Sequence, residues 1–187
     1  MAVPTLQEAY TKSVLPFFLK KKEYGNPMEV PRIKKVTVNT GLGKLVGQRT
    51  GEELKKILDA VLSDLTQITG QKPSLTQARK SVAGFGLRKG ASVGCKVTLR
   101  GKRMYDFLER FVRITLPRSR DFRGISPLAI DKKGNLTIGI PEHLVFPEIS
   151  PEHVKYPFGL EVTVTTRAQN AEEAQEMFGL LGFPFAK

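Results

Sequence analysis

The chain has 187 residues and 40% hydrophobic content, enough for one buried core, so a single domain over residues 1–187 is expected. Its 30 Lys and Arg oppose 18 Asp and Glu, a formal charge of +12 that predicts a polyanionic partner, nucleic acid before an anionic membrane surface. Cys95 is the single cysteine, which excludes an internal disulfide and a cysteine-based zinc site, and no stretch approaches the roughly 20 apolar residues of a membrane span.

The first third of the chain predicts a helix, a strand and a second helix. Thr5 opens the first helix in a capping-box pattern, and this helix should kink or stop at Pro16, because proline lacks a donor and clashes with the preceding turn. A strand is expected over 30–39, where apolar and polar residues alternate. Thr50 caps the second helix, whose apolar residues recur at i, i+3 and i+4 until Gly70 ends it.

The middle of the chain predicts two strands joined by a basic loop. Strands are expected over 74–78 and 92–100, and the second places Cys95 on its apolar side, where it should pack in the core. The loop 79–90 has three glycines and four basic residues, and we expect it to protrude. A third helix over about 102–114 should stop before Pro117.

The last third begins with a loop near 115–135 that shows no clear periodicity. Strands follow over 136–140 and 160–167, and Asn170 caps a final helix over about 171–181. The elements together predict an α+β fold, with a mostly antiparallel sheet, helices packed on one face and a polar, RNA-facing other face.

That polar face combines cations with neutral donors and acceptors. Lys and Arg neutralise phosphates, and Asn and Thr can bond to the 2′-hydroxyls that DNA lacks. An ordinary solvated sheet face is the alternative. The expected members are Lys35, Thr37, Asn39, Lys96, Thr98 and Arg100.

Enzymatic and metal-binding alternatives have weaker support, and neither a catalytic residue nor a cofactor is predicted. Gly41–Gly47 invites interpretation as a nucleotide loop, but it lacks the third glycine of GxGxxG at the right spacing and the GK[ST] ending of a P-loop. His143 and His153 would have to converge to bind zinc without any thiolate, so no metal site is expected. Lys20–Lys22 is too short a basic run for a membrane-surface helix.

Charge is unevenly distributed along the chain. Residues 72–123 hold 14 Lys and Arg against 3 acidic residues, whereas residues 140–187 hold 3 against 7. The N-terminus has no basic segment followed by an apolar one, so we expect no signal peptide and a reducing, cytoplasmic location. The asymmetry favours nucleic acid at the basic stretch and protein at the acidic end.

Several long motifs stand in order along the chain and carry a resemblance. They are Val30-Pro-Arg32, Val38-Asn-Thr-Gly-Leu-Gly43, Gly70-Gln-Lys-Pro73, Ala78-Arg-Lys-Ser-Val-Ala-Gly-Phe85, Gly94-Cys-Lys-Val-Thr-Leu-Arg-Gly101, Leu116-Pro-Arg-Ser-Arg-Asp-Phe-Arg-Gly124, Phe146-Pro-Glu-Ile149 and Gly182-Phe-Pro-Phe-Ala-Lys187. In order and spacing they resemble the bacterial ribosomal protein L5 family, which holds 5S ribosomal RNA in the central protuberance of the large subunit.

The resemblance implies residue roles. Asn39, Gln71 and Thr98 match family positions that contact 5S rRNA, and Lys72 lies beside Gln71 in the same motif. Arg79, Lys80 and Ser81 match the loop that reaches P-site transfer RNA.

The resemblance also implies partners and a location. The partners are 5S rRNA, 23S rRNA, P-site tRNA, neighbouring central-protuberance proteins and a small-subunit protein in an intersubunit bridge, with no membrane. The bridge would be made by the C-terminal half. The implied location is the ribosome in the cytoplasm.

Overall fold

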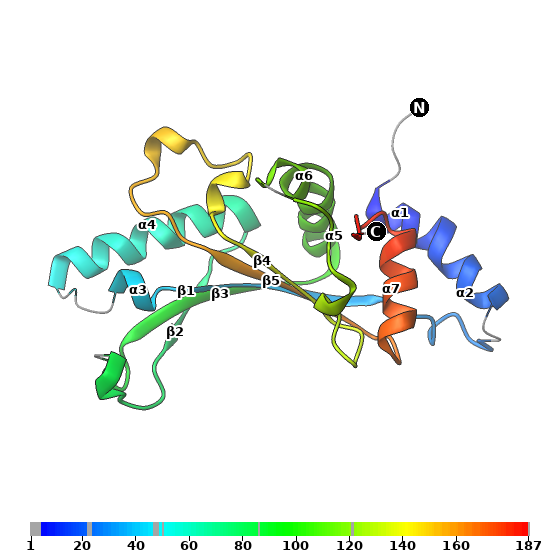
Figure 1. Cartoon of the computed structure of the whole chain (residues 1–187), viewed down its shortest axis with the longest axis horizontal. Coiled ribbons are helices and arrows are strands. Elements are labelled where there is room, and N and C mark those ends of the chain that lie inside the picture. The colour runs from blue at the N-terminus through cyan, green and yellow to red at the C-terminus, as the bar shows by residue number, and fades with distance from the viewer. Residues whose placement is uncertain are drawn as a thin grey trace. The chain divides into compact units, whose positions relative to one another are not determined.

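The computed structural model describes residues 5–21, 24–46, 49, 51–85, 87–120 and 122–186. Five strands form one antiparallel sheet in the order β2-β3-β1-β5-β4, and with the helices they confirm the α+β fold (Figure 1). The strands are β1 (Ile33–Gly41), β2 (Ser74–Gln77), β3 (Ser92–Leu99), β4 (Leu136–Ile140) and β5 (Leu160–Thr166). All five were predicted, with bounds that differ by up to three residues.

The chain divides into two compact units that both draw on this sheet. Unit 1 comprises residues 1–36, 100–138 and 163–187, and unit 2 comprises residues 37–99 and 139–162. Counted over these ranges, unit 1 carries 19 basic and 10 acidic residues, and unit 2 carries 11 and 8. The expectation of a single folding domain stays a prediction.

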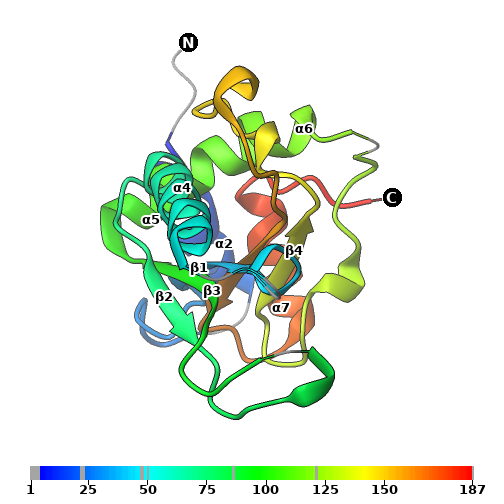
Figure 2. The ribbon, with the colours of Figure 1, turned by 90° about the vertical axis from the view of Figure 1, so that its left-hand side faces the viewer.

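Unit 2 contains the longest helix, α4 (Gly51–Thr69). Its buried residues Ile57, Val61, Leu65 and Ile68 form the stripe that the sequence predicted, and Gly70 ends the helix with a φ of 66°. Figure 2 shows α4 on one side of β1 and β3, with the β2–β3 hairpin extending away from it. The expected cap at Thr50 lies outside the described residues. A single helical turn, α3 (Gly43–Val46), follows β1.

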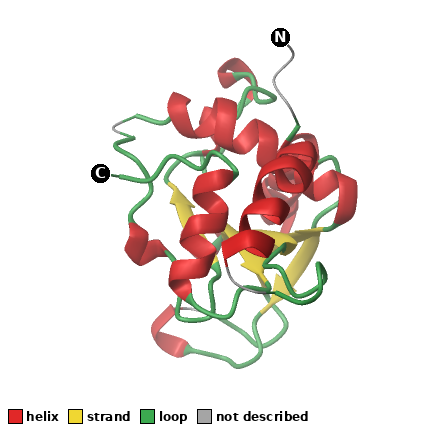
Figure 3. Ribbon diagram, turned by 90° about the vertical axis from the view of Figure 1, so that its right-hand side faces the viewer, coloured by secondary structure: helices red, strands yellow, loops and turns green. Residues whose placement is uncertain are grey.

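The helices of unit 1 come from both ends and the middle of the chain (Figure 1). Figure 3, seen from the side on which α2 and α7 lie in Figure 1, shows helices in front of the strands. Their core is rich in phenylalanine, because Phe18, Phe107, Phe111 and Phe178 are each at most 1% exposed. The final helix, α7 (Ala171–Leu180), begins as predicted, since the Asn170 side chain accepts a hydrogen bond from the Glu173 N–H at 2.9 Å.

Neither Pro16 nor Pro117 ends its helix, although the first helix was predicted to kink or stop at Pro16 and the third to stop before Pro117. The first helix runs as α1 (Leu6–Ala9), a π turn η1 (Tyr10–Val14) and α2 (Leu15–Lys21), and so passes Pro16. The Leu15 N–H bonds to the Tyr10 carbonyl, five residues back. The wider turn moves the carbonyl that the proline ring would meet in a regular α-helix.

The same device occurs in the third helix, where the predicted stop before Pro117 is wrong. The helix continues from α5 (Gly101–Arg110) through a π turn η3 (Phe111–Thr115) into α6 (Leu116–Arg118). Here the Leu116 N–H bonds to the Phe111 carbonyl. The predicted irregular loop near 115–135 therefore begins at residue 119, four residues later than expected.

That loop is more ordered than its composition suggested. A 3-10 turn, η4 (Pro127–Ala129), is capped by the Ser126 hydroxyl, and Ile125 forms a parallel bridge with Phe185. Asp131 makes a turn, because its carboxylate accepts from the N–H groups of Lys133 and Asn135, both at 2.8 Å. The remaining short turns are η2 (Ala83–Phe85), η5 (His143–Val145) and η6 (Pro151–His153).

Candidate nucleic-acid interface

The β2–β3 hairpin carries the basic part of unit 2. Between residues 65 and 99 there are six Lys and Arg and no Asp or Glu, whereas the rest of unit 2 has five basic and eight acidic residues. The two strands pair antiparallel with Ser74 opposite Lys96, and the register shifts between Thr76 and Gln77. Positive charge in this unit is therefore concentrated on one pair of strands and the loop that joins them.

The loop 79–90 continues the hairpin as hydrogen-bonded backbone. Ala78 exchanges backbone bonds with Ala91 and Gly90, and Val82 and Leu87 form a bridge with bonds of 2.9 and 3.1 Å. Arg79, Lys80 and Ser81 are all exposed, as a contact loop requires. Ser81 also braces the loop, because its hydroxyl accepts from the Lys89 N–H at 3.0 Å.

The predicted alternation on the central strands is present. Val38, Cys95, Val97 and Leu99 are at most 2% exposed, whereas Asn39 and Lys96 are exposed and Thr37 and Thr98 are half-buried. The polar side of these strands therefore offers an amide, an ammonium and two hydroxyls.

Gln71 is held at the end of α4 by a local network. Its backbone N–H donates to the Thr69 hydroxyl at 3.4 Å, and that hydroxyl donates to the Leu65 carbonyl at 2.6 Å. The Gln71 side-chain nitrogen donates to the Thr98 carbonyl at 3.4 Å. The structure thus brings together Gln71 and Thr98, which lie far apart in the sequence.

The remaining predicted RNA contacts are Lys72, Lys35 and Arg100, and they belong to different units. Lys72 is exposed immediately after Gln71 in unit 2. Lys35 is half-buried on β1, and Arg100 is exposed at the N-cap of α5; both belong to unit 1.

The glycine segment after β1 has no phosphate cradle among its described residues. The Leu42 N–H bonds to the Val93 carbonyl, and Leu42 and Val46 are buried at either end of α3. Backbone donors that would wrap a phosphate are instead used within this turn, where the Val46 N–H bonds to the Leu42 carbonyl at 2.8 Å. Gly47 lies outside the described residues.

Cys95 and His143, two titratable residues of unit 2, are buried in the core. Burial raises the pKa of the Cys95 thiol to about 11, so the thiol stays protonated at neutral pH. His143 is fully buried against Phe158, with its Nε2 3.4 Å from Asp64 Oδ2. The side chain of His153 lies outside what the structure describes. Among the described residues, no group of three metal-ligating side chains lies close enough together to hold a metal ion.

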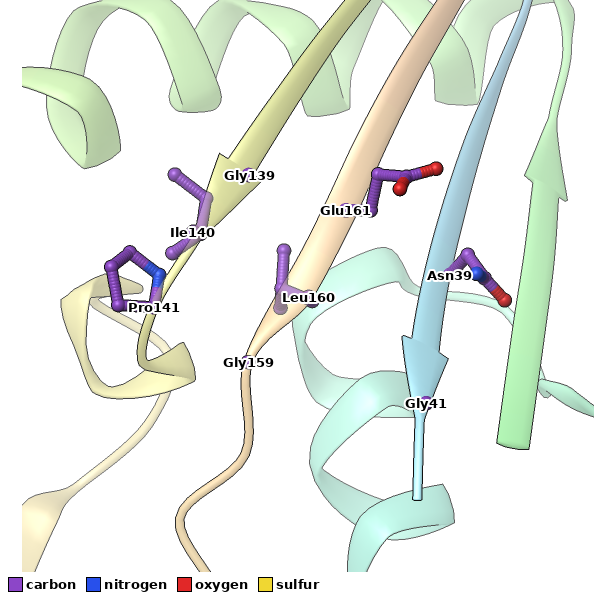
Figure 4. A pocket seen from close by; sticks show the side chains of 8 residues that line it. All are labelled: Asn39, Gly41, Gly139, Ile140, Pro141, Gly159, Leu160 and Glu161. Carbon is purple, nitrogen blue, oxygen red and sulfur yellow. The ribbon is translucent and has the colours of Figure 1, made fainter. Parts of the chain in front are cut away.

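Sequence reasoning overlooked Glu161 as a site residue. It is exposed on β5 and lines an open hollow with Asn39 (Figure 4). The alternation on β5 placed Glu161 on the polar side of the sheet, but only the order of the strands shows that β5 lies next to β1. No helix among the described residues is both long and apolar enough to cross a bilayer.

The fold and this surface define a class of protein, a basic α+β protein whose polar strands and basic hairpin suit a polyanionic partner. Two family models match the chain, one for ribosomal protein L5 over residues 26–88 and one for the C-terminus of the same ribosomal family over residues 92–185. The chain belongs to the ribosomal protein L5 family, as its motifs predicted.

Similar proteins match over nearly the whole chain. Proteins from Halothermothrix orenii and Syntrophomonas wolfei are 49% and 48% identical over 180 residues, covering 96% of this chain and 97% and 98% of theirs. One from Carboxydothermus hydrogenoformans is 46% identical over 185 residues, covering 99% of this chain and all of its own. Each is named large ribosomal subunit protein uL5.

Family membership settles the broad class. A member of this family is a structural ribosomal protein rather than an enzyme, and its place is on the ribosome in the cytoplasm, as the sequence predicted. The nucleotide-dependent enzyme that Gly41–Gly47 suggested is thereby excluded.

Proposed function

We propose that this protein, within the large ribosomal subunit, binds 5S rRNA and helps to attach it to the central protuberance. The observation that carries the proposal is the arrangement in unit 2, where a polar strand face adjoins a hairpin with six basic and no acidic residues between 65 and 99. The proposed contacts are Lys35, Thr37, Asn39, Gln71, Lys72, Lys96, Thr98 and Arg100.

These residues divide into two kinds of contact. The ammonium and guanidinium groups neutralise phosphates, and this contribution depends on salt but not on sequence. The amide and hydroxyl groups of Asn39, Gln71 and Thr98 fix the register by bonding to 2′-hydroxyls and base edges in the minor groove. The Gln71 bond to the Thr98 carbonyl holds one of these amides ready before RNA arrives.

Filter binding against bacterial 5S rRNA tests this proposal. We expect Asn39→Ala and Thr98→Ala each to weaken binding by about tenfold. Each variant removes a hydrogen bond to RNA, and a hydrogen bond in an interface that excludes water contributes roughly a factor of ten to the affinity. Affinity should fall steeply with salt. A folded wild-type protein that bound 5S rRNA no more tightly than an unrelated RNA duplex would overturn the proposal.

The hairpin loop has a different proposed partner. Arg79, Lys80 and Ser81 are exposed at one end of the β2–β3 ladder and would contact P-site tRNA. Arg79→Ala should therefore leave 5S rRNA affinity unchanged and lower the affinity of reconstituted ribosomes for P-site tRNA. Equal weakening of both activities would contradict this division of roles.

Three further partners follow from the family and the charge distribution. Residues 140–187 hold seven acidic residues against three basic ones, which suits a basic small-subunit protein in an intersubunit bridge. Contacts with 23S rRNA and with neighbouring central-protuberance proteins complete the proposed surroundings.

A further inference from the structure

An open hollow of about 480 Å³ lies on the polar side of the strands of unit 2. Its charged and amide side chains are Glu161 on β5 and Asn39 on β1, both exposed (Figure 4). The other residues of the lining have no polar side-chain atoms: Gly41, Gly139, Ile140, Pro141, Gly159 and Leu160.

Two of the three glycines that line this hollow, Gly41 and Gly139, are not required by the fold, whereas a Cβ atom at Gly159 would lie 3.0 Å from the Pro141 carbonyl oxygen. Gly41 and Gly139 lie in strands, which glycine weakens, and neither has a positive φ. A Cβ atom added at either position would meet nothing within 4 Å. Gly94 differs, because its Cβ would lie 2.5 Å from the Thr40 carbonyl oxygen and the close strand approach needs a glycine there.

The carboxylate of Glu161 determines which groups of an RNA could bind in the hollow. An ionised carboxylate has several acceptor sites and no donor, so Glu161, beside its interaction within the protein, can accept hydrogen bonds from RNA donors but cannot donate to a phosphate oxygen. The minor groove of an RNA helix is wide and shallow, and it presents two donors side by side, the guanine 2-amino group and the ribose 2′-hydroxyl. Asn39 can donate and accept beside them.

We infer that the hollow receives the minor-groove edge of a guanine–cytosine pair of the bound RNA, with the guanine 2-amino group donating to Glu161 and a ribose 2′-hydroxyl bonding to Asn39. This inference rests on the proposed binding of 5S rRNA and makes Glu161 a specificity-determining residue. Glycine at positions 41 and 139 leaves room for the ribose of the bound RNA to approach the backbone.

Analogue interference mapping tests the contact without knowing the guanine in advance. 5S rRNA transcripts with inosine at random guanines are partitioned by the wild-type protein, because inosine lacks the 2-amino group. We expect at least one guanine whose replacement weakens binding by about tenfold. With Glu161→Ala, interference at that guanine should disappear while interference elsewhere remains.

Gly139→Val provides a second test. Valine suits a strand, so the variant should fold, but its side chain fills the hollow and should weaken 5S rRNA binding by about tenfold. Thr137→Val on the same strand is the matched control and should bind as wild type, and circular dichroism verifies that both variants fold.

The outcomes separate this inference from the proposed function. If the wild-type protein shows no preference for 5S rRNA, the proposed function fails. If the preference is present but Glu161→Ala loses no guanine interference, or binds more tightly with an unchanged interference pattern, the minor-groove contact is wrong and the proposed function stands.

Discussion

At the scale of single residues, His143 is the group whose ionisation should affect stability most directly. Its ring stacks on Phe158 with centroids 3.9 Å apart, Nδ1 lies 3.3 Å from both the N–H and the carbonyl oxygen of Phe158, and Nε2 faces Asp64. Burial lowers the pKa of His143, and the attraction of Asp64, which raises it, is too weak to reverse this, since the Nε2–Oδ2 contact is long at 3.4 Å.

The lowered pKa sets the sign of a pH dependence. As pH falls through the ordinary histidine value of about 6.5, the unfolded chain takes up a proton more readily than the folded chain, so stability is lost. We expect the wild-type melting temperature to fall between about pH 7 and pH 5, a window that begins just above the ordinary value and extends below it.

His143→Gln removes this titration and should flatten that fall, although it lowers the melting temperature at pH 7 by removing the ring from its stack. Asp64, whose pKa is raised by burial, acts with the opposite sign in a more acidic range. An equally steep fall in the variant over pH 5–7 would show that other groups govern the transition.

The sequence predicts which polar residues lie on the open side of a strand, but it does not predict which residues of other strands they contact. Alternation placed Asn39, Lys96 and Thr98 on the polar side of their strands, because side chains of successive strand residues point to opposite faces. The bond from Gln71 to Thr98 and the pairing of Glu161 with Asn39 in the hollow depend on which strands are neighbours, and that requires the tertiary structure.

At the scale of elements, the cap of α7 yields a measurable prediction. The Asn170 side chain satisfies the Glu173 N–H, and the Glu173 carboxylate accepts from the Gln169 N–H at 2.6 Å and from the Tyr24 hydroxyl. Asn170→Ala should lower the free energy of unfolding by about 1 kcal/mol, because a helix donor loses its partner.

Urea unfolding followed by circular dichroism measures this change. Asn170→Asp keeps an acceptor at the N-cap and should unfold close to wild type. An alanine variant as stable as the aspartate variant would show that the cap contributes little here.

Most elements could be predicted from local patterns, whereas two helix ends could not. Periodicity identified α4 and the five strands, and Asn170 marked the start of α7. The rule that proline ends a helix failed at Pro16 and Pro117 because a π turn before each proline changes the hydrogen-bond spacing, and no residue preference announces such a turn.

At the scale of the whole molecule, the two compact units share strands of one sheet. The strands β1, β4 and β5 each contribute residues to both compact units, so neither unit has all of its strands without the other. We therefore expect one cooperative transition, with ellipticity and tyrosine fluorescence changing together on thermal unfolding. Two separated transitions would identify the units as independent domains.

The net charge of the whole molecule was the least specific indication of its partner. A formal charge of +12 indicated only a polyanionic partner. The structure shows that basic residues within unit 2 concentrate on the β2–β3 hairpin, while unit 1 holds most of the excess, 19 basic residues against 10 acidic. Sequence position alone could not divide the basic stretch 72–123 between the two units.

The paired π turns have a consequence for chain length. A π turn is equivalent to one residue inserted into an α-helix, so deleting a residue within Tyr10–Val14 or Phe111–Thr115 would restore regular spacing and bring the ring of Pro16 or Pro117 against a carbonyl. Each insertion and its proline therefore form a linked pair. We expect homologues that lack one of these prolines to tolerate a single-residue gap in the turn before it, and homologues that keep the proline to keep the extra residue.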